Sequence, residues 1–128
     1  MKYYHEKTLE NISFEEAVQK VTEALKKEGF GILTEIDLKA TLKKKLDVDF
    51  KPYKILGACN PPFAYKALIA EEKIGTMLPC NVIVQQKKDG IEIAAVDPVA
   101  SMQTVENKNL ESIALEIQSK LKTVIENL

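Results

Sequence analysis

Tyr53-Lys54-Ile55-Leu56-Gly57-Ala58-Cys59-Asn60-Pro61-Pro62 joins a predicted strand directly to a predicted helix. The first six residues are mainly apolar or β-forming, which is typical of a largely buried strand. Two consecutive prolines cannot continue a strand ladder, but they suit the first turn of a helix, where their missing N–H groups are not needed. Cys59 and Asn60 therefore lie at a strand-to-helix junction.

Hydrophobic periodicity and turn residues predict the other elements along the chain. The clearest signals are the capping box formed by Ser13 and Glu16, which opens a long helix, and Asp89-Gly90, which is typical of a tight hairpin. The predicted elements are strands over residues 2–8, 31–36, 53–58, 78–86 and 91–96, and helices over 13–28, after Asp37, after Pro61 and over 110–127.

The resulting order is β-α-β-α-β-α-β-β-α, and no linker or internal repeat divides the 128 residues. This order predicts a single domain over residues 1–128 with an α/β, or α+β-like, two-layer sandwich, in which helices pack on a mixed sheet of about five strands. If the third and fourth strands are parallel, Cys59 at the end of one and Cys80 at the start of the other lie at opposite edges of the sheet. They would then be too far apart for a disulfide.

The composition narrows the class of protein. The 18 lysines nearly balance the 19 acidic residues, so no strong field draws the chain to nucleic acid or to an anionic membrane. No run approaches the ~20 apolar residues that cross a bilayer, and the first residues lack the basic and then apolar pattern of a secretion signal. We expect a cytoplasmic domain with reduced thiols that binds neither nucleic acid nor membranes.

Cys59 is the main candidate for chemistry, because the start of the next helix would stabilise its thiolate. The competing interpretation is a small cysteine that packs at a tight junction. Cys80 has no helix start beside it and is predicted to be a core residue. With Cys59 as a nucleophile, Asn60 or backbone N–H groups would hold the developing negative charge, but no general base is evident. His5, the single histidine, is expected to be exposed on an edge strand.

Carboxylates form a second candidate site. Glu35, Asp37 and Asp97 lie at predicted strand ends, where open sheets tend to bind ligands, and Lys66 on the helix after Pro61 would add a cation to the same rim. Simpler roles are a helix cap for Asp37 and a turn for Asp97. One histidine and two distant cysteines predict no metal site, and no phosphate-binding glycine loop precedes a helix, so we expect no cofactor.

Four blocks of the sequence are specific when they are taken together. They are residues 28–37 with Gly-Phe-Gly, residues 53–62, residues 74–82 with Leu-Pro-Cys-Asn-Val, and Val-Asp-Pro at 96–98. In content and order they resemble the small bacterial and archaeal family called domain of unknown function 302, over nearly the whole chain. The resemblance implies a compact α/β domain that typically self-associates. It implies no substrate, cofactor or mechanism.

The sequence contains no complete catalytic set, so it does not decide whether the protein is an enzyme. Our leading hypothesis is a homodimeric domain that binds a small ligand or a partner protein near the Cys59 junction and the strand-end carboxylates. The alternative is a thiol-dependent enzyme or redox sensor that uses Cys59 as its nucleophile. A third possibility is an assembly module, which would show an exposed apolar face on the helix over 110–127.

Overall fold

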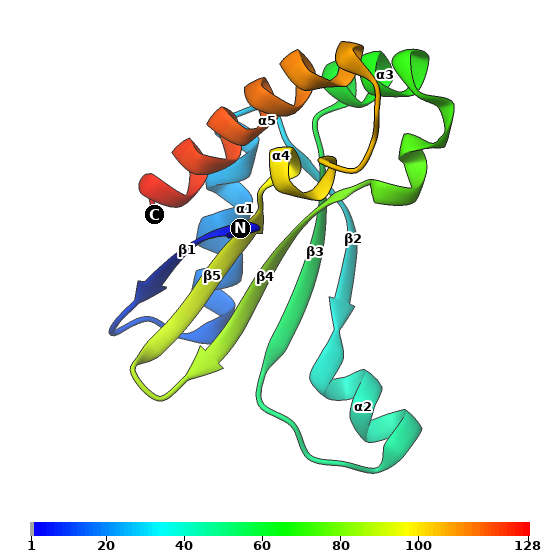
Figure 1. Cartoon of the computed structure of the whole chain (residues 1–128). Coiled ribbons are helices and arrows are strands. Elements are labelled where there is room, and N and C mark those ends of the chain that lie inside the picture. Colours follow the sequence, from blue (N-terminus) through cyan, green and yellow to red (C-terminus); the bar gives the residue numbers. More distant parts are fainter. Residues whose placement is uncertain (1) are drawn as a thin grey trace.

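A computed structural model describes residues 2–128 and has a five-stranded sheet with helices against one face (Figure 1). Its element order contains the predicted β-α-β-α-β-α-β-β-α, with a 3-10 helix, η1, and a short helix, α4, in addition. The elements are β1 (Tyr4–Leu9), α1 (Phe14–Lys27), β2 (Gly31–Asp37), α2 (Leu38–Leu46), β3 (Tyr53–Cys59), α3 (Pro61–Ala70), η1 (Glu72–Met77), β4 (Cys80–Lys87), β5 (Gly90–Val96), α4 (Pro98–Ser101) and α5 (Lys108–Glu126).

The strands lie in the order β1-β5-β4-β3-β2, and every neighbouring pair is antiparallel. The predicted α/β class with helices on a sheet is confirmed, but the predicted mixed sheet is wrong. The reason is that α2 and α3 lie beyond the ends of the strands that they connect (Figure 1), so each following strand returns beside the previous one, as in a long hairpin. Helix α1 joins the two edge strands and crosses the face of the sheet.

The core lies between the sheet and the layer formed by α1 and α5. Alternation along the strands turns Leu56, Val84 and Ile93 toward these helices, and all three are fully buried. Leu25 of α1 and Leu121 of α5 pack in the same cluster and are also fully buried. Each such side chain contributes about 1.5–3 kcal/mol relative to an exposed one, so this main cluster accounts for the packing of α1 and α5 on the sheet.

Two helix starts confirm the predicted caps. The Ser13 hydroxyl accepts a hydrogen bond from the Glu16 N–H at 3.1 Å, and an Asp37 carboxylate oxygen accepts one from the Ala40 N–H at 3.0 Å. The tight hairpin between β4 and β5 is confirmed as well, with Lys87 paired to Gly90. These caps and this hairpin could be predicted from the sequence because each depends on residues only three positions apart.

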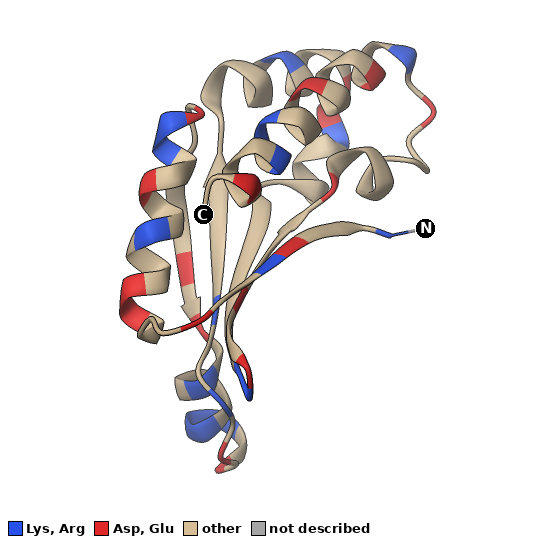
Figure 2. Cartoon of the chain, turned by 90° about the vertical axis from the view of Figure 1, so that its left-hand side faces the viewer, with Lys and Arg blue, Asp and Glu red and all other residues tan. Residues whose placement is uncertain are grey.

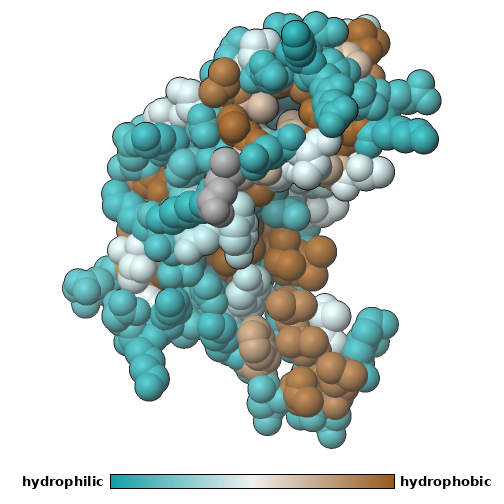
Figure 3. Space-filling model, in the orientation of Figure 1, coloured by the Kyte–Doolittle hydropathy of each residue, from teal (hydrophilic) through white to brown (hydrophobic). Residues whose placement is uncertain are grey.

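Among the described residues, no long helix lies on the opposite face of the sheet, and residues 38–52 extend beyond one end of the sheet as an arm (Figure 1). Helix α2, which is rich in lysine, begins this arm and has no buried residue (Figure 2). In Figure 3, apolar side chains gather over β2, β3 and the arm. Ile36 is 45% exposed there, and Ile55 and Ile83 on the open sheet face are only half-buried. The fold thus leaves one apolar surface uncovered.

Gly57 of β3 lies on the open face, where Thr34 of β2 and Pro79, just before β4, approach it closely. A Cβ at this position would lie 2.7 Å from Pro79 Cγ and would collide with Thr34 Oγ1. We predict that Gly57→Ala lowers the free energy of unfolding by about 1–3 kcal/mol in urea denaturation, because the Thr34 side chain and the rigid Pro79 ring must shift to relieve the overlap. Gly31→Ala in β2 is the matched control, since no atom lies within 4 Å of its added Cβ. Equal losses in the two variants would contradict this prediction.

Candidate functional site

The end of β3 and the start of β4 lie side by side, because these strands are antiparallel and Ala58 pairs with Cys80. Cys59, the next residue of β3, therefore lies at the same end of the sheet as Cys80. The predicted placement of the cysteines at opposite edges is wrong, since it assumed that the connecting helix α3 crosses the sheet between parallel strands. Both cysteines are free thiols.

A cavity of about 340 Å³ opens at this end of the sheet, beneath α3, α4 and α5. Its walls are almost entirely apolar. Ala67 of α3, Met102 after α4 and Ile117 of α5 come from different helices, and Cys59 and Cys80 complete the lining from the strand ends. The volume lies at the lower end of the range for small-molecule sites. The described residues that line it include no ionisable group besides the two thiols.

The two thiols differ in their surroundings. Cys80 is 8% exposed and belongs to the main core, as predicted. Burial, and to a smaller extent the neighbouring Cys59, raises the pKa of the Cys80 thiol to about 11. Cys59 is only half-buried, immediately before α3. Of the two sulfur atoms, that of Cys59 is therefore the more accessible to a reagent in the cavity.

Asn60 ties the junction to the turn that ends α1. It is 7% exposed, and its side-chain Nδ2 donates a hydrogen bond to the Glu28 carbonyl at 3.1 Å. Gly29, in the left-handed region with φ +87°, would place a Cβ 3.1 Å from the same Nδ2. Asn60 makes no side-chain cap to α3. Its amide thus holds the Cys-Asn segment against the Gly-Phe-Gly turn, which explains why both segments stand out in the sequence.

The three candidate carboxylates do not meet at one rim. Asp97 ends β5 at the same end of the sheet as Cys59, whereas Glu35 and Asp37 lie toward the opposite end, because β2 is antiparallel to β3. The expected rim of carboxylates is therefore wrong. Glu35 is paired with Lys54 at 2.6 Å, and this hydrogen bond raises the pKa of Lys54. Asp37 serves as the cap of α2.

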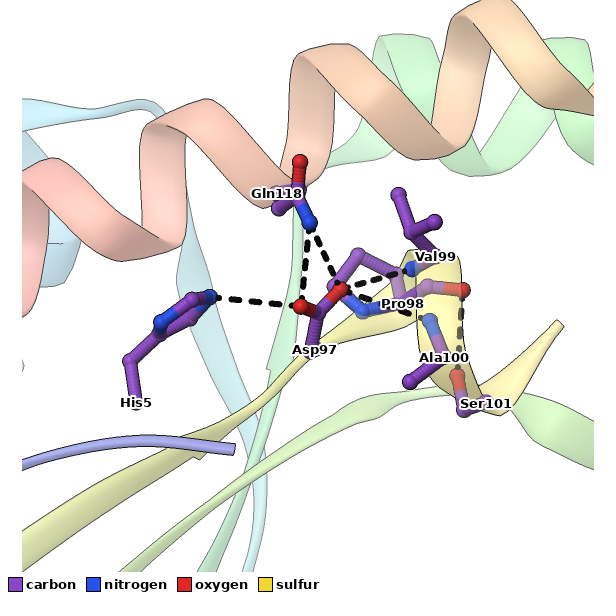
Figure 4. Close-up of polar contacts among 7 residues, drawn as sticks. All are labelled: His5, Asp97, Pro98, Val99, Ala100, Ser101 and Gln118. Carbon is purple, nitrogen blue, oxygen red and sulfur yellow. Dashed lines mark hydrogen bonds and ion pairs between the residues drawn. The ribbon is translucent and has the colours of Figure 1, made fainter. Parts of the chain in front are cut away.

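Asp97 is the centre of a polar cluster next to the cavity (Figure 4). Its carboxylate accepts hydrogen bonds from the Val99 and Ala100 N–H groups at 2.9 and 3.4 Å and from Gln118 Nε2 at 3.0 and 3.1 Å. His5 Nε2 lies 3.5 Å from the same carboxylate. His5 is thus half-buried against α5, which corrects the prediction of an exposed histidine. The cluster joins β1, the start of α4 and α5.

The sequence did not reveal the walls of the cavity that come from α5 and from the segment after α4. Ile117 and Met102 carry no local signal that separates a cavity wall from ordinary core.

Lys66 was a candidate site residue. It lies exposed on α3, with its Nζ 5.3 Å from the ring centroid of Phe63, which is part of the cavity wall. Lys66 therefore belongs to the region of the cavity and not to a rim of carboxylates.

The described residues, 2–128, contain no group of three or more His, Cys, Asp or Glu side chains placed to hold a metal ion. None of their helices is both long enough and apolar enough to cross a membrane.

We predict that iodoacetamide at pH 8 alkylates Cys59 and leaves Cys80 largely unmodified in the folded protein. A pKa of about 11 leaves roughly one Cys80 side chain in a thousand as thiolate at that pH, and only the thiolate reacts. Peptide masses follow the two sites separately. Raising the pH toward 11 should make Cys80 reactive, and unfolding in urea should equalise the rates. Equal rates in the folded protein at pH 8 would contradict the buried position of Cys80.

Comparison with known proteins agrees with this arrangement. The sequence pattern of the family described as "Domain of unknown function DUF302" matches residues 5–128. Among solved structures, an uncharacterized conserved protein DUF302 from Bacillus stearothermophilus is similar, with a TM-score of 0.90 and 27% identity over 98% of each chain. No match was found among curated proteins. The similarity therefore covers both Cys-Asn segments and all the helices around the cavity.

Proposed function

This chain belongs to the DUF302 family, and on that premise we propose that it binds a small, mainly apolar ligand in the cavity beside Cys59 and Cys80. The observation that carries the proposal is the apolar lining of a space of about 340 Å³ at the end of the sheet. Removing apolar surface from water contributes about 25 cal/mol per Å², so such a space favours an apolar guest.

Small side chains account for the space. Ala64 and Ala67 of α3 and Ala114 of α5 face the cavity where larger residues would fill it. An unfilled apolar space in a core lowers stability, because the atoms around it lose contacts. A guest that restores those contacts should therefore stabilise the folded chain.

We predict that a neutral apolar probe, octanol, raises the melting temperature of the wild-type protein, because a ligand that binds only the folded state stabilises it. Ala64→Leu places a larger side chain in the cavity and should abolish the rise. Gln19→Leu, on the exposed side of α1 and outside both the cavity and the arm, is the control and should keep it. Differential scanning fluorimetry measures both. An unchanged melting temperature for the wild type, or an equal rise in both variants, would refute the cavity as the site.

The alternative function is a thiol-dependent enzyme or redox sensor with Cys59 as nucleophile. It is supported by the position of this half-buried thiol, which lines the cavity directly before α3. Against it, His5 is engaged with Asp97 and is not part of the cavity wall. Cys59→Ser tests this alternative, which fails if the variant keeps the response of the wild-type protein to mild oxidation.

We further propose that the chain forms a homodimer through the open sheet face and the arm, residues 38–52. The support is the exposed apolar side chains there: Leu46 is 66% exposed and Val48 42%. A helix as short as α2 is marginal in water unless its apolar side is covered. In the described residues of α5, by contrast, Leu115 is the one large apolar side chain that is exposed, which disfavours assembly through that helix.

We predict that size-exclusion chromatography with light scattering gives the mass of two chains at micromolar concentration. Phe50→Lys, in the arm, should shift the mass to one chain, because a charge cannot be buried in an apolar contact without a partner. Leu115→Lys adds the same charge on α5 and should leave the mass unchanged. A single-chain mass for the wild type at every concentration would exclude the dimer.

A further inference from the structure

Two cations on neighbouring helices contact one aromatic residue of the cavity wall. Phe63 of α3 lines the cavity, and its ring centroid lies 5.3 Å from Lys66 Nζ and 5.9 Å from Lys120 Nζ of α5. Helices α3 and α5 are side by side at this end of the molecule (Figure 1). A single cation–π contact at an exposed site contributes only about 0.5–1 kcal/mol. Both ammonium groups therefore contact the same ring, and each contact is weak.

Neither ammonium group is neutralised. The ion pairs formed among residues 2–128 include neither Lys66 nor Lys120, and Glu116, one helical turn before Lys120, is in none of them either. Two positive charges near one ring make the potential there more positive, and this potential attracts an anion. The pair thus has the electrostatic character of an anion site beside an apolar cavity.

We propose that the ligand of the cavity is an anionic amphiphile: a short apolar chain that ends in a carboxylate. The chain would lie among the apolar side chains of the cavity, and the carboxylate would lie next to Lys66 and Lys120 at the ring of Phe63. This inference rests on the proposed function of the cavity and adds the chemical class of its ligand. Lysine ammonium groups act as point charges, so they suit a single carboxylate without a fixed orientation.

The position of Phe63 links the two parts of the site. Its ring is half-buried and belongs both to the cavity wall and to the two cation–π contacts. In the proposed complex the tail of the ligand would lie among Ala64, Ala67 and Ile117, and its head would lie at the Phe63 ring that both lysines contact. A neutral molecule with the same tail would gain the apolar contact alone.

The test compares three probes with the same eight-carbon tail, octanoate, octanol and octylamine, by isothermal titration calorimetry. We expect the wild-type protein to bind octanoate most tightly and octylamine most weakly. The double variant Lys66→Gln with Lys120→Gln should bind octanoate about 3- to 30-fold more weakly, as two partly exposed charge contacts imply, and octanol unchanged. Lys122→Gln, an exposed lysine of α5 that does not contact Phe63, is the matched control and should bind octanoate as the wild type does.

The dependence of binding affinity on salt concentration is a second test, and it uses the folded wild-type protein. Added salt should weaken the binding of octanoate and leave that of octanol unchanged, because ions screen exposed charges and not apolar contact. If octanol binds as tightly as octanoate, or if the double variant keeps the preference for octanoate, the carboxylate assignment is wrong while the cavity remains a binding site. If none of the three probes binds, the proposed function of the cavity fails as well.

Discussion

The antiparallel pairing of β3 with β4 is the constraint on which the rest of the molecule depends. Because Ala58 lies opposite Cys80, both Cys-Asn segments are brought to one end of the sheet. The helix between the two strands cannot then lie over the sheet face, and it packs beyond the strand ends against α5. The space that remains between α3, α5 and the strand ends is the cavity. A parallel pair would have covered the sheet face with α3 and separated the two thiols.

The junction at Cys59 is held in place from both sides. Asn60 hydrogen-bonds the Glu28 carbonyl at the end of α1, and Gly57 lets Thr34 and Pro79 approach the strand closely. On the far side of the cavity, Asp97 joins β1 and α5 to the start of α4 through His5 and Gln118 (Figure 4). The polar groups of Asn60, Asp97 and Gln118 thus hydrogen-bond at the rim, and the interior is left to apolar side chains. This division is usual for small-molecule sites, in which the lining is mainly apolar and a few polar groups orient the ligand.

Apolar surface is exposed both at the cavity and over the open face of the sheet, and these two surfaces differ in shape. At the end of the sheet near α3 the surface is concave and closed by three helices, which fits a small ligand. Over β2, β3 and the arm it is open and continues onto Leu46 and Phe50, which fits a broad protein contact (Figure 3). A homodimer and a small-molecule ligand would therefore use separate surfaces of the same domain.

The sequence by itself determined the features that depend on neighbours in the chain. The Ser13 cap, the Asp37 cap, the Asp-Gly hairpin, the core position of Cys80 and the strand-to-helix junction at Cys59 all follow from residues a few positions apart. The tertiary structure alone decided which strands are neighbours, that Glu35 and Asp97 lie at opposite ends of the sheet, that His5 meets Asp97, and that α5 completes the cavity. The physical reason is that hydrophobic periodicity states which face of an element is buried but not which element covers it. That choice is made by the packing of the whole core.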